Sequence, residues 1–379
     1  MTKKDAVKKI LRREDPGRFV YAPNYWQWFT HQQNHKLQSG DNLHCRTQLD
    51  CIRHFDQDVF SRNIYSSPFD YWFGGLSDKI YDHVSVEKVV EMRGPDTITT
   101  FRYSTPEGVL EERLRYVFSE STLVQEKYLV DNPDTQLEIF KDLINRTAFR
   151  YLPGSYKKVE DEIGNDGIAV AGEFFSPLKM LHIYFGQVEA TYLLVDHEEE
   201  IRPLLDIHEE RQLELLQEML DNGIRAFMAM DNLDSMFHPP HYVEEYSASF
   251  YERASALCHS RDANFFIHAC GQQKANLKLI SSLGVDGLEG VAYPPLGDVQ
   301  LEEAMELSGD RFIITGGVSA AETVNMKTRD EVFTYVDNLL KRMKPYRHRF
   351  MLSASCNTAI ETPWEILKYF NEAWQELGK

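Results

Sequence analysis

The sequence predicts an α/β fold, a (β/α)₈ TIM barrel with an inserted antiparallel β-hairpin or small sheet near residues 86–130. Apolar runs typical of buried strands recur near residues 20, 60, 170, 227, 267, 288, 313 and 352, and most precede a helical pattern. A doubly wound open sheet, the main alternative, would need a Gly-rich phosphate loop after its first strand, and the sequence has none there. We therefore expect a single barrel domain over residues 1–379, with an N-terminal extension and the β insertion inside 1–150.

The first part of the chain is the less regular one. We expect helices at 2–14, 47–55 and 132–151 and strands at 18–23 and 58–62. Polar and apolar residues alternate through 97–103, and a turn sequence follows at 104–108, a pattern typical of an antiparallel hairpin. This segment interrupts the β/α alternation, so we interpret it as an insertion.

The second part alternates regularly. We expect strands at 168–174, 224–230, 265–270, 286–291, 311–316 and 350–355, and helices at 178–185, 196–221, 242–259, 272–283, 299–308, 329–343 and 363–377. In such a barrel the active site forms where the strands end, at their carboxyl termini. Residues with reactive side chains at these positions are therefore the first candidates for function.

Charge and cysteine content restrict the class of protein. The net charge of −18 disfavours nucleic acid and anionic membranes as partners. No apolar run approaches the roughly 20 residues that span a bilayer, and no signal-peptide pattern follows the N-terminus. Five cysteines without a CxxC spacing favour free or metal-bound thiols. We expect a cytoplasmic enzyme, and a homodimer is compatible with the sequence.

Two residues at the end of one predicted strand have metal-ligating side chains. His268 and Cys270 lie two positions apart, so a strand would direct both to the same face. Cys356 follows the last strand, and barrel closure would bring it to the same mouth. One histidine and two cysteines with an open or carboxylate fourth position form the ligand set of a catalytic zinc. We predict a Zn²⁺ site at His268, Cys270 and Cys356.

Two carboxylates at other strand ends compete for the fourth position. Glu173 ends the third strand and Asp231 the fourth. We predict both as catalytic residues and favour Glu173 as the additional metal ligand. The alternative for each is a hydrogen bond to a loop, or to His268 to orient it.

An aromatic segment follows the first strand. Tyr25, Trp26, Trp28 and His31 lie within it, and Tyr65 follows the second strand. Aromatic walls with a few polar groups are a common composition of a ligand pocket, so we predict these five as substrate-binding residues. The alternative is that the segment packs against the first helix.

Several motifs resemble the uroporphyrinogen decarboxylase superfamily, over nearly the whole chain. They are His268-Ala269-Cys270-Gly271, Gly284-Val285-Asp286-Gly287, Gly309-Asp310-Arg311 before a strand into Gly316-Gly317, Ser355-Cys356-Asn357 with Pro363, the insert at 104–110, and Tyr128-Leu129-Val130. Decarboxylases of this superfamily carry an Arg-rich N-terminal segment, whereas residues 25–33 contain no arginine. The His-x-Cys and distant Cys are instead similar to the zinc motif of the cobamide-dependent methyltransferase branch.

That resemblance implies a function and a partner. The expected activity is zinc-dependent transfer of a methyl group from a small methylated substrate to the Co(I) corrinoid of a separate corrinoid protein. The aromatic residues favour a methoxylated aromatic substrate, which the enzyme would O-demethylate. One alternative is a methyl-corrinoid:thiol methyltransferase similar to those that methylate coenzyme M. A second alternative is a decarboxylase of the uroporphyrinogen decarboxylase type.

Overall fold

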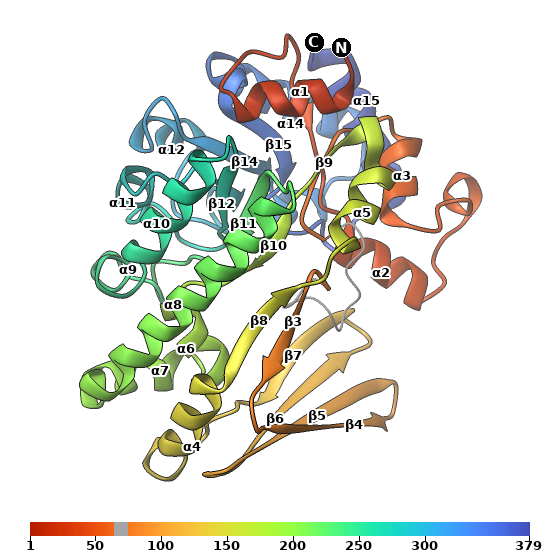
Figure 1. The fold of residues 1–379 in the computed structure, drawn as a ribbon. Helices are drawn as coiled ribbons and strands as arrows, with labels where there is room; N and C mark the ends of the chain where they lie inside the picture. The colour runs from red at the N-terminus through yellow and green to blue at the C-terminus, as the bar shows by residue number, and fades with distance from the viewer. Residues whose placement is uncertain (64–74) are drawn as a thin grey trace.

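Parallel strands form a barrel wall in the computed structural model, which describes residues 1–63 and 75–379 (Figure 1). The strands of this wall are β1 (Val20–Tyr21), β2 (Val59–Ser61), β9 (Gly167–Ala169), β10 (Ala171–Phe174), β11 (Ala226–Ala229), β12 (Asn264–His268), β13 (Gly287–Val291), β14 (Ile313–Val318) and β15 (Phe350–Ala354). Counting β9 and β10 as one strand interrupted at Val170, they coincide with the eight predicted positions. The predicted α/β barrel class is confirmed.

The wall consists of two hydrogen-bonded sheets. Seven strands follow the order β1-β15-β14-β13-β12-β11-β10, and β2 pairs with β9. All of these pairs are parallel. Between β1 and β2, the backbone N–H of Asp58 donates to the carbonyl of Tyr21 at 2.9 Å, the contact that brings the first two strands together.

Side-chain alternation divides the strands into an inner and an outer face. Phe60 of β2, Phe266 of β12 and Met351 of β15 belong to one buried apolar cluster with helix α1 (Lys3–Leu11). Phe265 and Ile267, one position away on β12, belong instead to the larger cluster shared with the surrounding helices. Helix α1 therefore packs across one end of the barrel interior (Figure 1). His268 shares the inner face with Phe266.

The insertion contains the predicted small antiparallel sheet, in the strand order β4-β5-β6-β7 (Figure 1). A separate antiparallel pair, β3 with β8, was not predicted. The strands of the insertion are β3 (Ser77–Tyr81), β4 (Ser85–Arg93), β5 (Asp96–Thr105), β6 (Gly108–Val117), β7 (Thr122–Lys127) and β8 (Thr147–Tyr151). The helix predicted to reach Tyr151 ends at Asn145, because the aromatic and β-branched residues after it pair with β3 as β8.

Helices follow most barrel strands. Besides α1, they are α2 (Trp26–Asn34), α3 (Gln48–His54), α4 (Pro133–Asn145), α5 (Ser155–Ile163), α6 (Pro177–Phe185), α7 (Gln187–Asp196), α8 (Glu198–Asp221), α9 (Pro240–Tyr246), α10 (Ala248–His259), α11 (Leu277–Ser282), α12 (Leu301–Leu307), α13 (Ala320–Thr323), α14 (Arg329–Met343) and α15 (Trp364–Leu377). The single helix predicted at 242–259 is two helices, α9 and α10, that meet at Ser247. Within residues 1–63 and 75–379, no helix combines the length and apolarity needed to cross a membrane.

The contact between β1 and β2 yields a test of the barrel. Asp58 is fully buried and accepts hydrogen bonds from the Arg18 guanidinium and from the Tyr21 N–H at 3.0 Å. Asp58→Ala leaves Arg18 and this N–H without their partner, so we expect a loss of about 3 kcal/mol in unfolding free energy. Thermal or urea unfolding measures it. The exposed Asp161, paired with Lys157, is the control, and its Ala variant should change stability by less than about 0.5 kcal/mol. Equal effects of the two substitutions would contradict this role for Asp58.

Candidate metal centre

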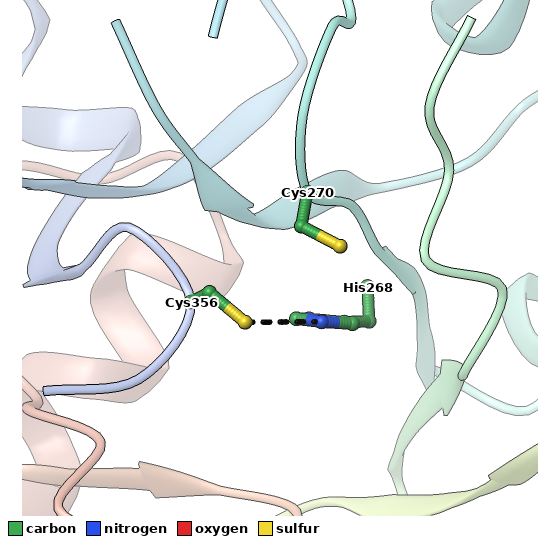
Figure 2. Close-up of side chains that lie close together, drawn as sticks. All are labelled: His268, Cys270 and Cys356. Carbon is green, nitrogen blue, oxygen red and sulfur yellow. Dashed lines mark hydrogen bonds between the residues drawn. The ribbon is translucent and has the colours of Figure 1, made fainter. Parts of the chain in front are cut away.

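His268 is the most buried member of the candidate site. It is the last residue of β12, it is fully buried, and its side chain points into the barrel. Its Nε2 lies 3.7 Å from the Sγ of Cys356 (Figure 2). Its Nδ1 is hydrogen-bonded to the carboxylate of Glu289, on the neighbouring strand β13. The two ring nitrogens therefore face different partners.

Cys270 and Cys356 both lie two residues beyond the end of a strand. The strand predicted over 265–270 ends at His268, so Cys270 reaches the site from the loop that follows β12. The next residue, Gly271, has φ +80°, and a Cβ there would lie 1.8 Å from Oδ2 of Asp234. Only glycine fits this turn. Cys356 follows β15, and its carbonyl accepts a 2.8 Å hydrogen bond from Nδ2 of Asn24.

The donor atoms of the predicted trio converge. One ligand atom each from His268, Cys270 and Cys356 lie within 4.8 Å of one another. In a tetrahedral zinc site the ligand atoms are roughly 3.5–3.8 Å apart, given bond lengths near 2.0–2.3 Å. The 3.7 Å between His268 and Cys356 is already in this range. Two sulfurs and one imidazole fit zinc in type, the His268–Cys356 pair also fits it in spacing, and three protein ligands leave a fourth position for a substrate.

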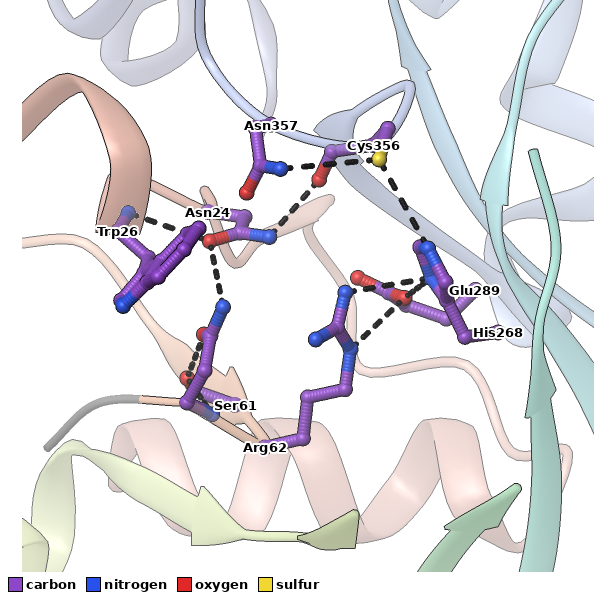
Figure 3. A network of polar contacts seen from close by, with 9 residues as sticks. Asn24, Trp26, Ser61, Arg62, His268, Glu289, Cys356 and Asn357 are labelled. Atoms are coloured by element: carbon purple, nitrogen blue, oxygen red, sulfur yellow. Dashed lines mark hydrogen bonds and ion pairs between the residues drawn. The ribbon is translucent and has the colours of Figure 1, made fainter. Parts of the chain in front are cut away.

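A buried carboxylate and a guanidinium hold the histidine. Nε of Arg62, the residue directly after β2, lies 3.3 Å from Oε2 of Glu289, and its Nη2 lies 3.3 Å from Nδ1 of His268 (Figure 3). Burial opposes the ionisation of Glu289, but the charges of Arg62 and His268 outweigh it and lower the pKa of Glu289 to about 2. A carboxylate hydrogen-bonded to one ring nitrogen is the usual support of a metal-ligating histidine.

The pKa values of the two cysteine thiols are shifted in opposite directions. The hydrogen bond from Cys356 lowers the pKa of Cys270, against the effect of burial and with help from the nearby Lys179 cation. The same hydrogen bond, together with burial, raises the pKa of Cys356 well above its usual value. One thiolate is thus favoured without a metal, and a second needs an additional positive charge. A divalent cation between the sulfurs would supply it.

The predicted carboxylates are engaged elsewhere. Glu173 accepts hydrogen bonds from the N–H of Leu76 and the hydroxyl of Ser77, both at 2.5 Å, and burial raises its pKa to about 8. It is not a member of the converging ligand group, so its role as a ligand remains a prediction.

Asp231 has a comparable set of partners. It accepts hydrogen bonds from the N–H of Ser176, at 2.9 Å, and from the Tyr251 hydroxyl, and burial raises its pKa. These contacts join β11 to the start of α6 and to α10. Its catalytic role also remains a prediction.

The aromatic segment is mostly interior. Tyr25 and Trp28 are each 1% exposed; Tyr25 donates to Gln57 and Trp28 stacks on Trp364. His31 lies on α2, where it contacts Ser121 of the insertion and the ring of His35.

Trp26 is also buried, with 3% of its surface exposed. Its backbone N–H donates to Oδ1 of Asn24, the residue whose side chain also donates to the Cys356 carbonyl (Figure 3). The backbone at Trp26 is thus connected to the candidate site through one intervening side chain. Tyr65 and the aromatic residues at 69–73 lie outside the described residues.

Three supporting residues were not found from the sequence. They are Glu289, Arg62 and Asn24. The available signal for Glu289 was an acidic residue inside an otherwise apolar strand, where an ionised group needs a buried partner. Arg62 ends a predicted strand and carried no comparable signal.

The fold and the site together define a barrel protein with a candidate thiolate–imidazole metal centre at the carboxyl ends of its strands. The family model for uroporphyrinogen decarboxylase (URO-D) matches residues 119–377, and the chain belongs to this family. No curated protein matches it significantly.

Two solved structures illustrate the likeness. A methyltransferase from Methanosarcina mazei has a TM-score of 0.62 at 13% sequence identity, with 99% of each chain covered, and it shares the fold. D-Psicose 3-epimerase from Clostridium cellulolyticum H10, solved with D-tagatose, has a TM-score of 0.37 at 10% identity, covering 60% of this chain and 83% of that one. That similarity is too weak to support an argument.

Zinc content tests the trio directly. We expect about one zinc per purified chain, and His268→Ala, Cys270→Ala and Cys356→Ala should each remove it, because two remaining ligands hold zinc poorly. Cys258→Ala is the control, since this buried cysteine is a residue of α10 and lies outside the ligand group. Elemental analysis gives the stoichiometry. Near-stoichiometric zinc in all three ligand variants would reject the site.

Chelator competition tests the support of His268. Glu289→Gln should weaken zinc binding about 10- to 100-fold, because a neutral amide no longer fixes the imidazole or pairs with Arg62. Glu209→Gln is a matched control, since Glu209 is also buried and paired with an arginine, Arg253. Unchanged affinity in Glu289→Gln would contradict the assignment. In the same assay, a loss in Glu173→Gln would support Glu173 as the fourth ligand.

Proposed function

We propose that this protein is a zinc-dependent methyltransferase that moves a methyl group from a small methylated substrate to the Co(I) corrinoid of a partner protein. The observation that carries the proposal is the convergence of His268, Cys270 and Cys356 within 4.8 Å at the barrel mouth. The leading substrate class is methoxylated aromatics, so the reaction would be an O-demethylation.

Further observations support methyl transfer over decarboxylation. A metal-free decarboxylase has no need for three soft ligands in one place, nor for a carboxylate that orients the histidine. The segment that would hold the carboxylates of a porphyrin contains no arginine between residues 25 and 33. The similarity of the whole fold to a methyltransferase is consistent with this choice.

Each residue of the site has a separate task. Glu289 and Arg62 fix the imidazole so that Nε2 faces the cysteines. Asn24 holds the backbone at Cys356, and Nδ2 of Asn357 lies 3.7 Å from its sulfur. When bound at these ligands, zinc would act as a Lewis acid that stabilises the anion left behind by the departing methyl group.

The surroundings of the site favour an anionic leaving group. Lys179 of α6 is 5% exposed, and burial lowers its pKa, whereas the nearby Asp231 and Cys270 favour its charged form. A cation in a buried position stabilises a developing phenolate more strongly than one in water does. An aromatic methyl ether releases such a phenolate when its methyl group is transferred.

A methyl-transfer assay tests the proposal. With cob(I)alamin as acceptor and 3-methoxybenzoate as donor, the zinc-loaded protein should produce the absorbance of methyl-cobalt. Cys356→Ala should remove several kcal/mol of transition-state stabilisation by the metal, so methyl transfer should be about 100-fold slower or more. Methanol, methylamine and dimethyl sulfide serve as competing donors. Transfer in the opposite direction, from methylcobalamin to a thiol, would favour the alternative methyltransferase. Zinc-independent decarboxylation of a porphyrinogen would reject the proposal.

A further inference from the structure

A cavity of about 420 Å³ lies between the inserted sheet and helix α6. Its volume is in the range of small-molecule binding sites. One wall comes from β3, β5 and β6 of the insertion, and the opposite wall comes from α6. The family match begins at residue 119, so most of the strand wall lies in a part of the chain that the family model does not cover.

Regular alternation gives the cavity its aromatic walls. Lys79 and Tyr81 lie two positions apart on β3, and Phe101 and Tyr103 lie two positions apart on β5, so each pair faces the same side of its strand. Tyr184 of α6 also lines the cavity, and its hydroxyl accepts a hydrogen bond from the Lys79 ammonium at 3.0 Å. Several rings around one cavity suit a flat aromatic ligand, because stacked and edge-on ring contacts are favourable.

Three lysines line this cavity although the protein as a whole is acidic. Lys79 and Lys179 are on its β3 and α6 sides and Lys88 is on an exposed strand, and the carboxylates Asp78 and Glu112 line it as well. Asp78 occupies the alternate face of β3 and lies 3.8 Å from Arg150. Glu112 accepts a hydrogen bond from the Tyr103 hydroxyl at 2.7 Å. Two of the three ammonium groups are associated with rings, Lys79 with Tyr184 and Lys88 with Phe101.

The cavity lies close to the candidate metal centre along the backbone. Asn232 lines the cavity, and the N–H of the next residue, Leu233, donates to the carbonyl of His268 at 3.2 Å. Ser77 lines it as well and donates to Glu173, at the end of barrel strand β10. His182 contributes a buried imidazole whose Nδ1 has no hydrogen-bond partner among the described residues. A polar group of a ligand would satisfy such a nitrogen.

From these observations we infer that the cavity is the binding chamber of the methyl donor and selects single-ring aromatic acids. The ring packs against the aromatic residues that line the cavity, and the carboxylate pairs with the ammonium of Lys79, beside the Tyr184 hydroxyl. The methyl ether then points toward Lys179 and the thiol ligands. This inference rests on the proposed methyl transfer and adds the substrate class to it.

Binding measurements test the chamber independently of catalysis. Isothermal titration of the zinc-loaded protein, without corrinoid, compares 3-methoxybenzoate with uncharged methoxybenzene. We expect the acid to bind at least about tenfold more tightly than the ether, because a charge-assisted hydrogen bond contributes about this much to affinity. Lys79→Met should abolish the difference and Lys79→Arg should retain it, while Phe101→Ala should weaken both ligands. Lys157→Met, at an exposed lysine of α5, is the matched control and should change neither.

Several outcomes would overturn the inference. Equal affinity for the acid and the neutral ether would do so, as would unchanged selectivity in Lys79→Met. Tighter binding of the small anionic thiol 2-mercaptoethanesulfonate than of the aromatic acid would do so too. Selective binding without any methyl transfer would retain the chamber and reject the proposed reaction. Methyl transfer by the protein, together with ligand binding that does not depend on Lys79, would retain the proposed reaction and reject the chamber.

Discussion

The contact of the Glu289 carboxylate with His268 and Arg62 is the interaction on which the site depends. An isolated carboxylate in this interior would cost several kcal/mol, so its ionised state requires both partners. The three residues come from β13, β12 and the end of β2, and the contact therefore links parts of the barrel wall that are distant in sequence. With Nδ1 engaged, the imidazole can present only Nε2 to the cysteines.

Backbone spacing next to this contact leaves no room for a larger residue. Gly290 has φ +97°, and a Cβ there would lie 2.4 Å from the carbonyl oxygen of Ala269 and 3.2 Å from Cε1 of His268. The loop that carries Cys270 can thus approach β13 only because residue 290 has no side chain. Glycines at 271 and 290 and the pairing of His268 with Glu289 in the sheet register bring the site together.

Much of this arrangement could be predicted from the sequence. The residues that were not predicted correctly were missed for physical reasons. Apolar runs identified the barrel strands, and the topology alone brought Cys356 to His268. Glu289 was missed because its role depends on the register between β12 and β13, which no local pattern encodes. An aromatic residue can line either a pocket or a core, so composition could not show that Tyr25, Trp26 and Trp28 are buried.

X-ray absorption at the zinc edge of the purified protein tests the central claim most directly. We expect two sulfur neighbours at about 2.3 Å from the zinc and at least one nitrogen at about 2.0–2.1 Å. The sulfur count should fall to one in Cys356→Ala if any metal remains bound. A shell of oxygen and nitrogen alone, or a sulfur count unaffected by Cys356→Ala, would contradict it.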